Sequence, residues 1–320
     1  MKHPATYIII SLVATLSVAS CARTDIDKSP ADPVQILRLD SAALSGDSAA
    51  FMASGDAASL WLRIVGADSS DLSGYFSSLQ GKPYNEPVAS QFVSTDSLAA
   101  KLGYIFNNVE RLTDIVPPAV VATVVSPYNQ SVVTADSVVY IALNHYLGPE
   151  HEFYAWFPDY QRRLKHPSRI GADVVEAVIS EKYPFSPAAK YPTALSRIAA
   201  EGAVVEAVMQ LTGASEQEAL GYDADEYRWL LDNERQAWES LLARNLIFTT
   251  DPSIVETLVR PNSVTSCLHP EAPGRAGRFI GHRIVAAYLD SHPSATLTDV
   301  LSPDFYNDPK LLEKAGYVAK

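Results

Sequence analysis

The segment AVVATVVSPYNQSVVTADSVVYIAL, residues 119–143, decides the fold class of this chain. It contains three valine-rich runs, AVVATVV (119–125), SVVT (131–134) and SVVYIAL (137–143), separated by the turn-forming sequences Pro-Tyr-Asn-Gln and Ala-Asp. Short runs of β-branched residues bounded by turn residues are typical of neighbouring strands. The segment therefore predicts a small β-sheet.

Helical patterns dominate the rest of the chain. A first strand is predicted upstream by VQILRL (34–39), and apolar residues at helical spacing predict helices over 47–65 and 95–113. Beyond residue 168 the β signal disappears, and helical patterns follow over 169–182, 191–212, 223–245 and 276–290. Early strands followed by a helical half are typical of α+β proteins rather than of alternating α/β proteins. We expect a single α+β domain over residues 33–320, with a small N-terminal β-sheet and a mainly helical second half.

Composition excludes two broad classes of protein. The 320 residues include 25 Lys and Arg against 37 Asp and Glu, which gives a net charge of −12. A nucleic-acid-binding protein needs a basic surface to displace the counterions of phosphates, so no nucleic-acid partner is expected. The hydrophobic content of 47% is too high for a disordered chain and supports a sizeable core.

The N-terminus has the features of an export signal. Lys2 precedes an apolar stretch over residues 5–16, and the small residues of VASC (18–21) follow it. This arrangement resembles the signal and lipobox of a bacterial lipoprotein. An ordinary secretory signal and a membrane-spanning helix are the alternatives, but the apolar stretch is shorter than the roughly 20 helical residues that cross a bilayer. Residues 1–20 are therefore predicted to be a lipoprotein signal peptide.

Cleavage of that signal would leave Cys21 as the first residue, carrying acyl chains such as palmitate that anchor the protein to a membrane. Residues 21–32 are polar without an apolar period and predict a tether. Loss of Lys2 takes the net charge to −13, so the acyl anchor rather than attraction to anionic headgroups holds the protein. Ala22 follows the cysteine in place of Asp, which by the enterobacterial sorting rule permits transfer to the outer membrane. Which face of that membrane the body occupies stays open.

Common catalytic motifs do not occur in the sequence: no His-Glu-x-x-His zinc helix, GxSxG elbow, P-loop, GxGxxG or EF-hand loop. His145 and His151 flank acidic residues and can in principle bind a metal, but solvated loop histidines are far commoner. Cys267 and His269 are a conceivable nucleophile and base, but residues two apart do not face each other on a helix. Cys267 is instead expected to be a small buried hydrophobe, and no metal or cofactor is predicted.

Two segments place charged residues in apolar helices. In AAEGAVVEAVM (199–209), at least one of Glu201 and Glu206 is expected to be half-buried beside a cationic partner. In PGRAGRFIGHRIVAAYL (273–289), Gly277 and Gly281 thin one helix face enough for another backbone to pack closely.

The second segment also carries a basic stripe at spacings of three and four: Arg275, Arg278 and His282. One interpretation is an anion-recognising pocket with Glu201 opposite this stripe. The other, and the commoner arrangement, is a buried ion-pair network that joins two helices.

Four segments follow the lipobox in a fixed order: ILRLDSAAL (36–44), VVYIALNHYLGPEHEFY (138–154), DADEYRWLLDNERQAWESLLARNLIFTTD (223–251) and APGRAGRFIGHRIVAAYLD (272–290). In this order and spacing the chain resembles the gliding-motility lipoprotein GldB family of Bacteroidetes. The PGRxGRxxGxxIVxxY pattern, from Pro273 to Tyr288, is the most specific element. The resemblance covers nearly the whole mature chain and implies an outer-membrane lipoprotein linked to gliding and to the secretion machinery that accompanies it.

A weaker similarity connects the helical half to the YjaZ-like predicted zinc metalloproteases. In that family a His-Glu-x-x-His helix precedes an EGxA motif that supplies the third metal ligand. The EGxA motif falls on residues 201–204, so Glu201 takes the ligand position, and a later Gly-Tyr pair falls on Gly277 and Arg278. The metal helix falls near 172–182, where only Glu176 matches and both histidine positions are apolar. The similarity implies a zincin-like fold without zinc, in which Arg278 supplies the positive charge opposite Glu201.

The sequence therefore favours a non-enzymatic lipoprotein of the cell envelope that acts as a scaffold or as a binding component with envelope protein partners. Two alternatives stay open. One is a hydrolase with a dispersed site that uses Glu176, Glu201 and His282. The other is a small-anion-binding protein in which Arg275 and Arg278 bind a carboxylate or phosphate.

Overall fold

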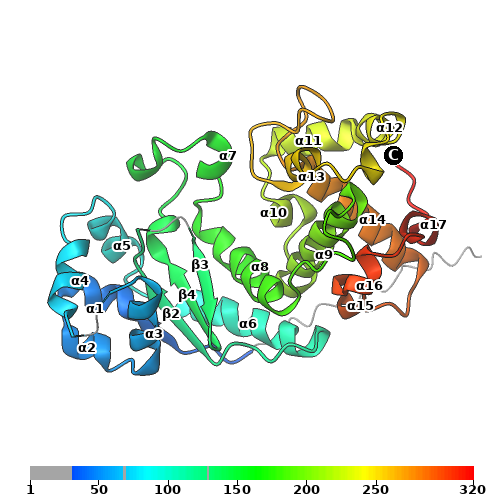
Figure 1. Ribbon diagram of the computed structural model, residues 1–320. Helices are drawn as coiled ribbons and strands as arrows, with labels where there is room; N and C mark the ends of the chain where they lie inside the picture. The colour runs from blue at the N-terminus through cyan, green and yellow to red at the C-terminus, as the bar shows by residue number, and fades with distance from the viewer. Residues whose placement is uncertain (1–30, 68–69, 128–129) are drawn as a thin grey trace, which may run out of the picture.

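The computed structural model describes residues 31–67, 70–127 and 130–320 (Figure 1). The predicted signal peptide, Cys21 and the predicted tether up to residue 30 lie outside these ranges. A half that contains the sheet and a helical C-terminal half lie side by side, with α8 (Ile170–Lys182) between them. The α+β class expected from the sequence is confirmed.

The sheet has four strands in the order β1-β2-β4-β3: β1 (Ile36–Arg38), β2 (Val120–Val124), β3 (Val132–Ala135) and β4 (Val138–Ala142). β2 pairs in parallel with both β1 and β4, whereas β3 pairs antiparallel with β4 at the edge. β4 is buried along its whole length and β3 is only half-buried. The continuous apolar run of β4 is what a strand covered on both faces requires.

In the described part of the chain, six helices precede β2: α1 (Leu39–Ser45), α2 (Ser48–Met52), α3 (Asp56–Ile64), α4 (Leu72–Leu79), α5 (Asn85–Gln91) and α6 (Asp96–Leu112). Tyr140 of β4 packs on Trp61 of α3 at a ring-centroid distance of 5.1 Å. Its hydroxyl also donates a hydrogen bond of 2.8 Å to the carbonyl of Ala57. α3 thus covers one face of the sheet, while α8 packs against β3 and β4 from the side of the helical half (Figure 1).

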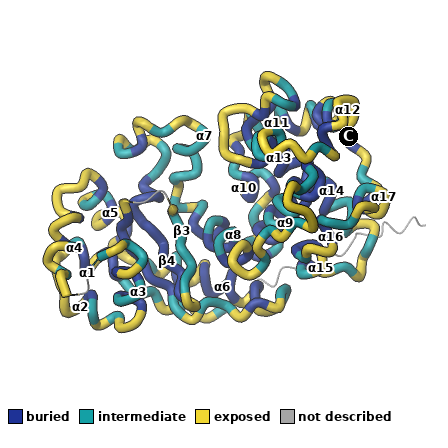
Figure 2. Tube along the Cα trace, viewed as in Figure 1, coloured by how far each residue is buried: buried dark blue, intermediate teal, exposed yellow. Residues whose placement is uncertain are grey.

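The remaining helices are α7 (Asp159–Arg162), α9 (Ala194–Thr212), α10 (Glu216–Leu220), α11 (Ala224–Asp232), α12 (Glu234–Ala243), α13 (Pro252–Val259), α14 (Ala276–Ser291), α15 (Leu297–Leu301), α16 (Pro303–Tyr306) and α17 (Leu311–Ala315). Short 3-10 turns cover Leu143–His145, Glu152–Tyr154, Pro167–Arg169 and Leu246–Phe248. α9 lies at the centre of the helical half, in contact with α6, α8, α13, α14 and α15. Its mostly buried surface is visible in Figure 2 and matches its predominantly apolar sequence.

Glycines allow α9 and α14 to cross at very short distance. A Cβ added to Gly202 would lie 2.1 Å from the carbonyl carbon of Gly281, and one added to Gly281 would lie 1.8 Å from the carbonyl oxygen of Ile198. Gly277 faces α13 in the same way, with Leu258 O at 2.6 Å from an added Cβ. The close backbone packing predicted for Gly277 and Gly281 is therefore confirmed.

Two predicted helices are divided in the structure. The pattern over 47–65 forms α2 and α3 because Gly55, between them, has a φ of 62°, which ends a right-handed helix. The pattern over 223–245 forms α11 and α12 because Asn233 leaves the helical region at φ −117° and ψ 12°. The apolar period continues across each break, which is why the sequence pattern alone joins the two pieces.

Candidate functional site

A buried arginine joins α8, α9 and α14 through two ion pairs. Arg278 of α14 is only 2% exposed. Its Nη2 lies 3.0 Å from Oε1 of Glu176 on α8, and its Nε lies 3.3 Å from Oε2 of Glu201 on α9. The structure therefore brings Glu201 and Arg278 together, as both sequence interpretations required.

Two further arginines contact the carboxylates that pair with Arg278. Arg197 binds the free oxygen of Glu201, with Nη2 at 2.9 Å from Oε1. Arg169 lies 3.7 Å from Glu176 Oε1 and 3.0 Å from Asp173 Oδ1. Positive and negative groups thus alternate across the three helices. We call these six residues the arginine–carboxylate cluster: Arg169, Asp173, Glu176, Arg197, Glu201 and Arg278.

The protonation states of the cluster follow from opposing effects. Burial by itself lowers the pKa of Arg278, but the charges of Glu176 and Glu201 outweigh it and the pKa is raised. Burial by itself raises the pKa of Glu176, but Arg278 and Arg169 outweigh it and the pKa is lowered. Burial raises the pKa of Asp173, and Arg169 offsets only part of that effect. Arg278 and Glu176 are therefore held in their charged forms at neutral pH, as in a structural ion pair.

Three of the four residues predicted for a pocket line one cavity of about 380 Å³: Glu201, Arg275 and Arg278. Glu176 and Arg197 line it as well, together with the rings of Tyr183, Phe185 and Tyr306. Tyr183 follows α8 and Tyr306 ends α16, so the cavity opens where these elements meet α9 and the start of α14.

His282 lies apart from this cavity in a second buried cluster. It is 2% exposed, and its Nε2 lies 2.8 Å from Glu206 Oε2 while its Nδ1 lies 2.5 Å from Glu216 Oε1. Arg283 and Tyr227 also bind Glu216, at 3.1 and 2.6 Å from its Oε2. Arg275 and Arg278 line the cavity and His282 does not, so the expected stripe of these three residues does not form the wall of one pocket.

Two carboxylates set the charge of His282. Burial by itself lowers its pKa, but the hydrogen bonds that it donates to Glu206 and Glu216 together outweigh burial and raise it. Glu206 is 1% exposed and pairs with His282, whereas Glu201 pairs with Arg197. Both glutamates of segment 199–209 therefore have a cationic partner, as the sequence predicted for at least one of them. The cluster of His282 with Glu206 and Glu216 therefore couples α9, α10 and α14 through charge.

The sequence model of the family described as gliding motility protein GldB matches residues 32–319. The chain belongs to this family. GldB is a family of lipoproteins linked to gliding motility, which confirms the resemblance inferred from the motifs. Comparisons with curated proteins and with solved structures find no match. Within residues 31–67, 70–127 and 130–320, no helix has the length and apolar character needed to cross a bilayer.

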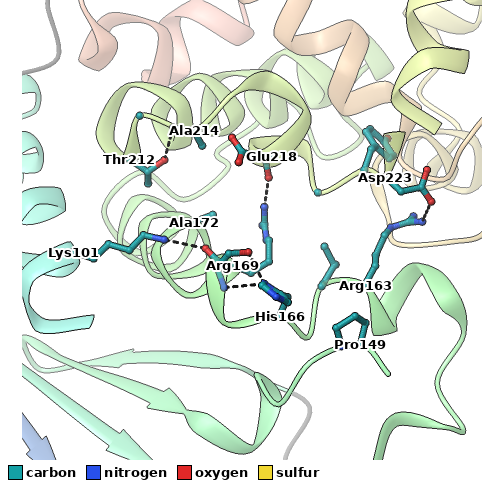
Figure 3. A pocket seen from close by; sticks show the side chains of 15 residues that line it. Lys101, Pro149, Arg163, His166, Arg169, Ala172, Thr212, Ala214, Glu218 and Asp223 are labelled. Atoms are coloured by element: carbon teal, nitrogen blue, oxygen red, sulfur yellow. Dashed lines mark hydrogen bonds and ion pairs between the residues drawn. The ribbon is translucent and has the colours of Figure 1, made fainter. Parts of the chain in front are cut away.

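The GldB-family chain has a larger cavity, of about 520 Å³, beside the arginine–carboxylate cluster (Figure 3). Lys101, Arg163 and Arg169 line it with His166 and Asp223. Lys101 donates a hydrogen bond of 3.0 Å to the carbonyl of Ser168, and burial lowers its pKa. No sequence pattern indicates this site, because its residues come from separate elements and share no spacing. Arg169 belongs both to this cavity and to the cluster.

A third cavity, of about 320 Å³, contains a hydroxyl beside two nitrogen bases. Ser131 Oγ lies 3.0 Å from His145 Nδ1 and 3.3 Å from Lys165 Nζ. Burial lowers the pKa of Lys165. The sequence pattern around His145 suggested only a metal ligand and gave no indication of this contact with Ser131 and Lys165.

The two weaker sequence interpretations gain no support from the geometry. Among the described residues, no group of three or more His, Cys, Asp or Glu side chains is arranged to hold a metal ion. His151 Nδ1 instead accepts a hydrogen bond from Phe153 N at 3.1 Å. Cys267 is half-buried rather than buried, with a pKa raised by burial, while the His269 ring packs at a tilt against Trp229.

Proposed function

We propose that this GldB-family chain is a non-catalytic outer-membrane lipoprotein that acts as a scaffold or binding component of gliding and protein-secretion machinery. The observation that carries the proposal is the position of Arg278 between Glu176 and Glu201. The acyl group on Cys21 would hold the protein on the membrane, and envelope proteins would be its partners.

Arg278 supplies the positive charge that the two carboxylates need. In the YjaZ-like predicted metalloproteases, which the helical half resembles, the glutamate at the position of Glu201 is a metal ligand. Here a buried guanidinium contacts that glutamate, and the buried neighbours of Glu176 on α8 include the apolar Val175 and Ile179. A divalent cation would have to displace Arg278 and leave its charge buried without a partner, which is strongly unfavourable. These contacts support a zincin-like fold in which an ion pair occupies the metal position.

Metal content and peptidase activity test the proposal on the same sample. The full-length lipoprotein would be purified in detergent, incubated with zinc chloride, dialysed and analysed for zinc by mass spectrometry. A mixture of unstructured peptides then reports hydrolysis. We expect neither stoichiometric zinc nor zinc-dependent cleavage. One zinc per chain together with zinc-dependent cleavage would overturn the proposal.

Ser131 favours a second candidate function, hydrolysis of an ester or amide. Its hydroxyl is within hydrogen-bond distance of His145 and Lys165, either of which would accept its proton when neutral. A fluorophosphonate probe distinguishes the two functions. Labelling of the wild-type chain that is absent in Ser131→Ala would establish a serine hydrolase. The non-catalytic proposal predicts no labelling of either protein, and it predicts that Ser131→Ala restores gliding or secretion in a deletion strain.

A further inference from the structure

Arg275 has a backbone conformation that is rare for its residue type. Its φ of 64° and ψ of 22° place it in the left-handed region, immediately before α14. Side chains other than Gly, Asn and Asp are strained there. Such a residue persists only where its surroundings fix it, and residues of this kind cluster at ligand sites.

The surroundings of Arg275 do fix its backbone. The hydroxyl of Thr265 donates a hydrogen bond of 2.7 Å to Pro273 O and accepts one of 3.0 Å from Ala276 N. Tyr222 donates a third, of 2.7 Å, from its hydroxyl to Gly274 O. These bonds hold the chain on both sides of Arg275, so its side chain starts from a rigid position.

The charge of Arg275 is uncompensated, unlike those of its neighbours. Arg197 and Arg278 both contact Glu201, and Arg278 also contacts Glu176. No hydrogen bond or ion pair to the side chain of Arg275 is found among the described residues, and its Nε is buried. The buried Nε atoms of Arg197 and Arg278 also lack a hydrogen bond, so the feature that sets Arg275 apart is the lack of a carboxylate partner. Its guanidinium is therefore available to an anion from outside the chain.

The cavity in front of Arg275 suits one negative charge on an apolar body. Its five charged residues carry three positive and two negative charges, a net charge of +1. The rings of Tyr183, Phe185 and Tyr306 supply flat apolar walls. A dianion such as phosphate would face repulsion from Glu176 and Glu201, whereas a carboxylate matches the single free guanidinium and its fork of donors.

We propose that Arg275 binds the carboxylate of a monocarboxylic acid whose aromatic or apolar body packs against Tyr183, Phe185 and Tyr306. The inference rests on the proposed binding function and names its ligand class. The carboxylate can belong to a free organic acid or to the C-terminus of a polypeptide, because both present the same group to Arg275.

Calorimetric titration of the full-length lipoprotein in detergent tests the site with defined probes. We expect phenylacetate to bind at millimolar concentration, and phenylacetamide and inorganic phosphate to bind at least about tenfold more weakly. Phenylacetamide has no negative charge to pair with Arg275, and phosphate is repelled by Glu176 and Glu201. A short peptide that ends in phenylalanine, with a free or an amidated C-terminus, distinguishes the two sources. Tighter binding of the free-carboxylate peptide than of phenylacetate assigns the site to a polypeptide terminus; the reverse assigns it to a free acid.

Two variants remove the charge without straining the backbone. Asn and Gly both tolerate the left-handed region, so Arg275→Asn and Arg275→Gly should fold and lose at least about tenfold in phenylacetate affinity. Arg260→Asn is the control, because Arg260 is an exposed arginine paired with Glu256. Equal binding by wild type and Arg275→Gly, or no binding of any probe, would refute the site. Either result leaves the zinc and probe-labelling tests unchanged, so the two proposals fail separately.

Discussion

Gly202 and Gly281 face each other where α9 crosses α14, and a Cβ on Gly202 would lie 2.1 Å from the carbonyl carbon of Gly281. The contact is between two backbones, so neither side can move without displacing a helix. This crossing brings Glu201 of α9 and Arg278 of α14 within ion-pair distance.

Gly281→Ala should destabilise the protein by about 3 kcal/mol or prevent folding, because its Cβ would overlap Ile198 O. Helix propensity alone predicts the opposite sign, a gain of about 1 kcal/mol. Gly74→Ala is the comparison, since its Cβ meets the side chain of Asp71, which can rotate away at the cost of its capping hydrogen bond to Gly74 N, about 1 kcal/mol. Urea unfolding of the three proteins measures both effects. Equal stability of Gly281→Ala and Gly74→Ala would show that the helices can separate at no cost.

Arg278→Met should cost about 3–5 kcal/mol in the free energy of unfolding, because Glu176 and Glu201 would lose a partner that is 2% exposed. Arg260→Met, at an exposed pair with Glu256, should cost less than about 1 kcal/mol.

Replacing the carboxylates as well tests the cause of that loss. Combining Arg278→Met with Glu176→Gln and Glu201→Gln should recover a large part of the stability, since no buried charge then lacks a partner. Urea denaturation of the single and triple variants gives the comparison. A triple variant less stable than Arg278→Met would mean that the packing of these side chains, and not the pairing of their charges, determines the stability of the cluster.

Arg275→Gly should stabilise the fold by up to about 1 kcal/mol, because glycine adopts a φ of 64° without strain. Arg275→Ala keeps the strain and should not gain. Thermal unfolding in the absence of ligand separates the two variants. A loss of stability in Arg275→Gly would assign the arginine to the architecture of the fold instead of to a ligand.

His282 makes stability depend on pH in a defined direction. Its folded pKa is raised above 6.5, so its contribution is complete below that pH and is lost as the pH rises through the folded pKa. Glu216 has a folded pKa lowered below 4.5, so its contribution is complete above that pH and is lost as the pH falls through the folded pKa. The contribution of the pair is therefore greatest between these two limits.

Urea unfolding at about pH 5.5 and about pH 8.5 measures the alkaline part of this dependence. The stability difference between wild type and His282→Gln should shrink at the higher pH. His166→Gln, at an exposed histidine, is the comparison for the loss of an imidazole. A difference that is constant with pH would contradict the assignment of a charged His282.

Cys21→Ser should abolish incorporation of labelled palmitate and release the protein from membranes, because acylation needs the thiol at the start of the mature chain. Cys267→Ser provides the control, since it removes the half-buried free cysteine. Membrane fractionation with fluorography checks both variants. Retention of Cys21→Ser in the membrane fraction would refute the predicted anchor.

Local sequence patterns predicted the elements better than their arrangement. The valine runs correctly predicted β2, β3 and β4. The position of β4 between β2 and β3 depends on long-range strand pairing, which a local pattern does not predict. The contact of Glu201 with Arg278 followed from spacing and resemblance. The place of His282 did not, because its partner Glu216 lies on a short helix whose position depends on the packing of α9 and α14. Ser131, His145 and Lys165 meet only through tertiary structure, so no spacing between them was informative.

The ion pair between Glu176 and Arg278 spans 102 residues of sequence. An exported chain emerges from its N-terminal end, so the sheet and α8 reach the far side of the membrane well before α14. Until α14 arrives, Glu176 and Glu201 have no Arg278, and α9 has no helix to cross at Gly202. Export as the predicted signal peptide implies would therefore impose an order of assembly in which residues 276–320, about a seventh of the polypeptide, close the core.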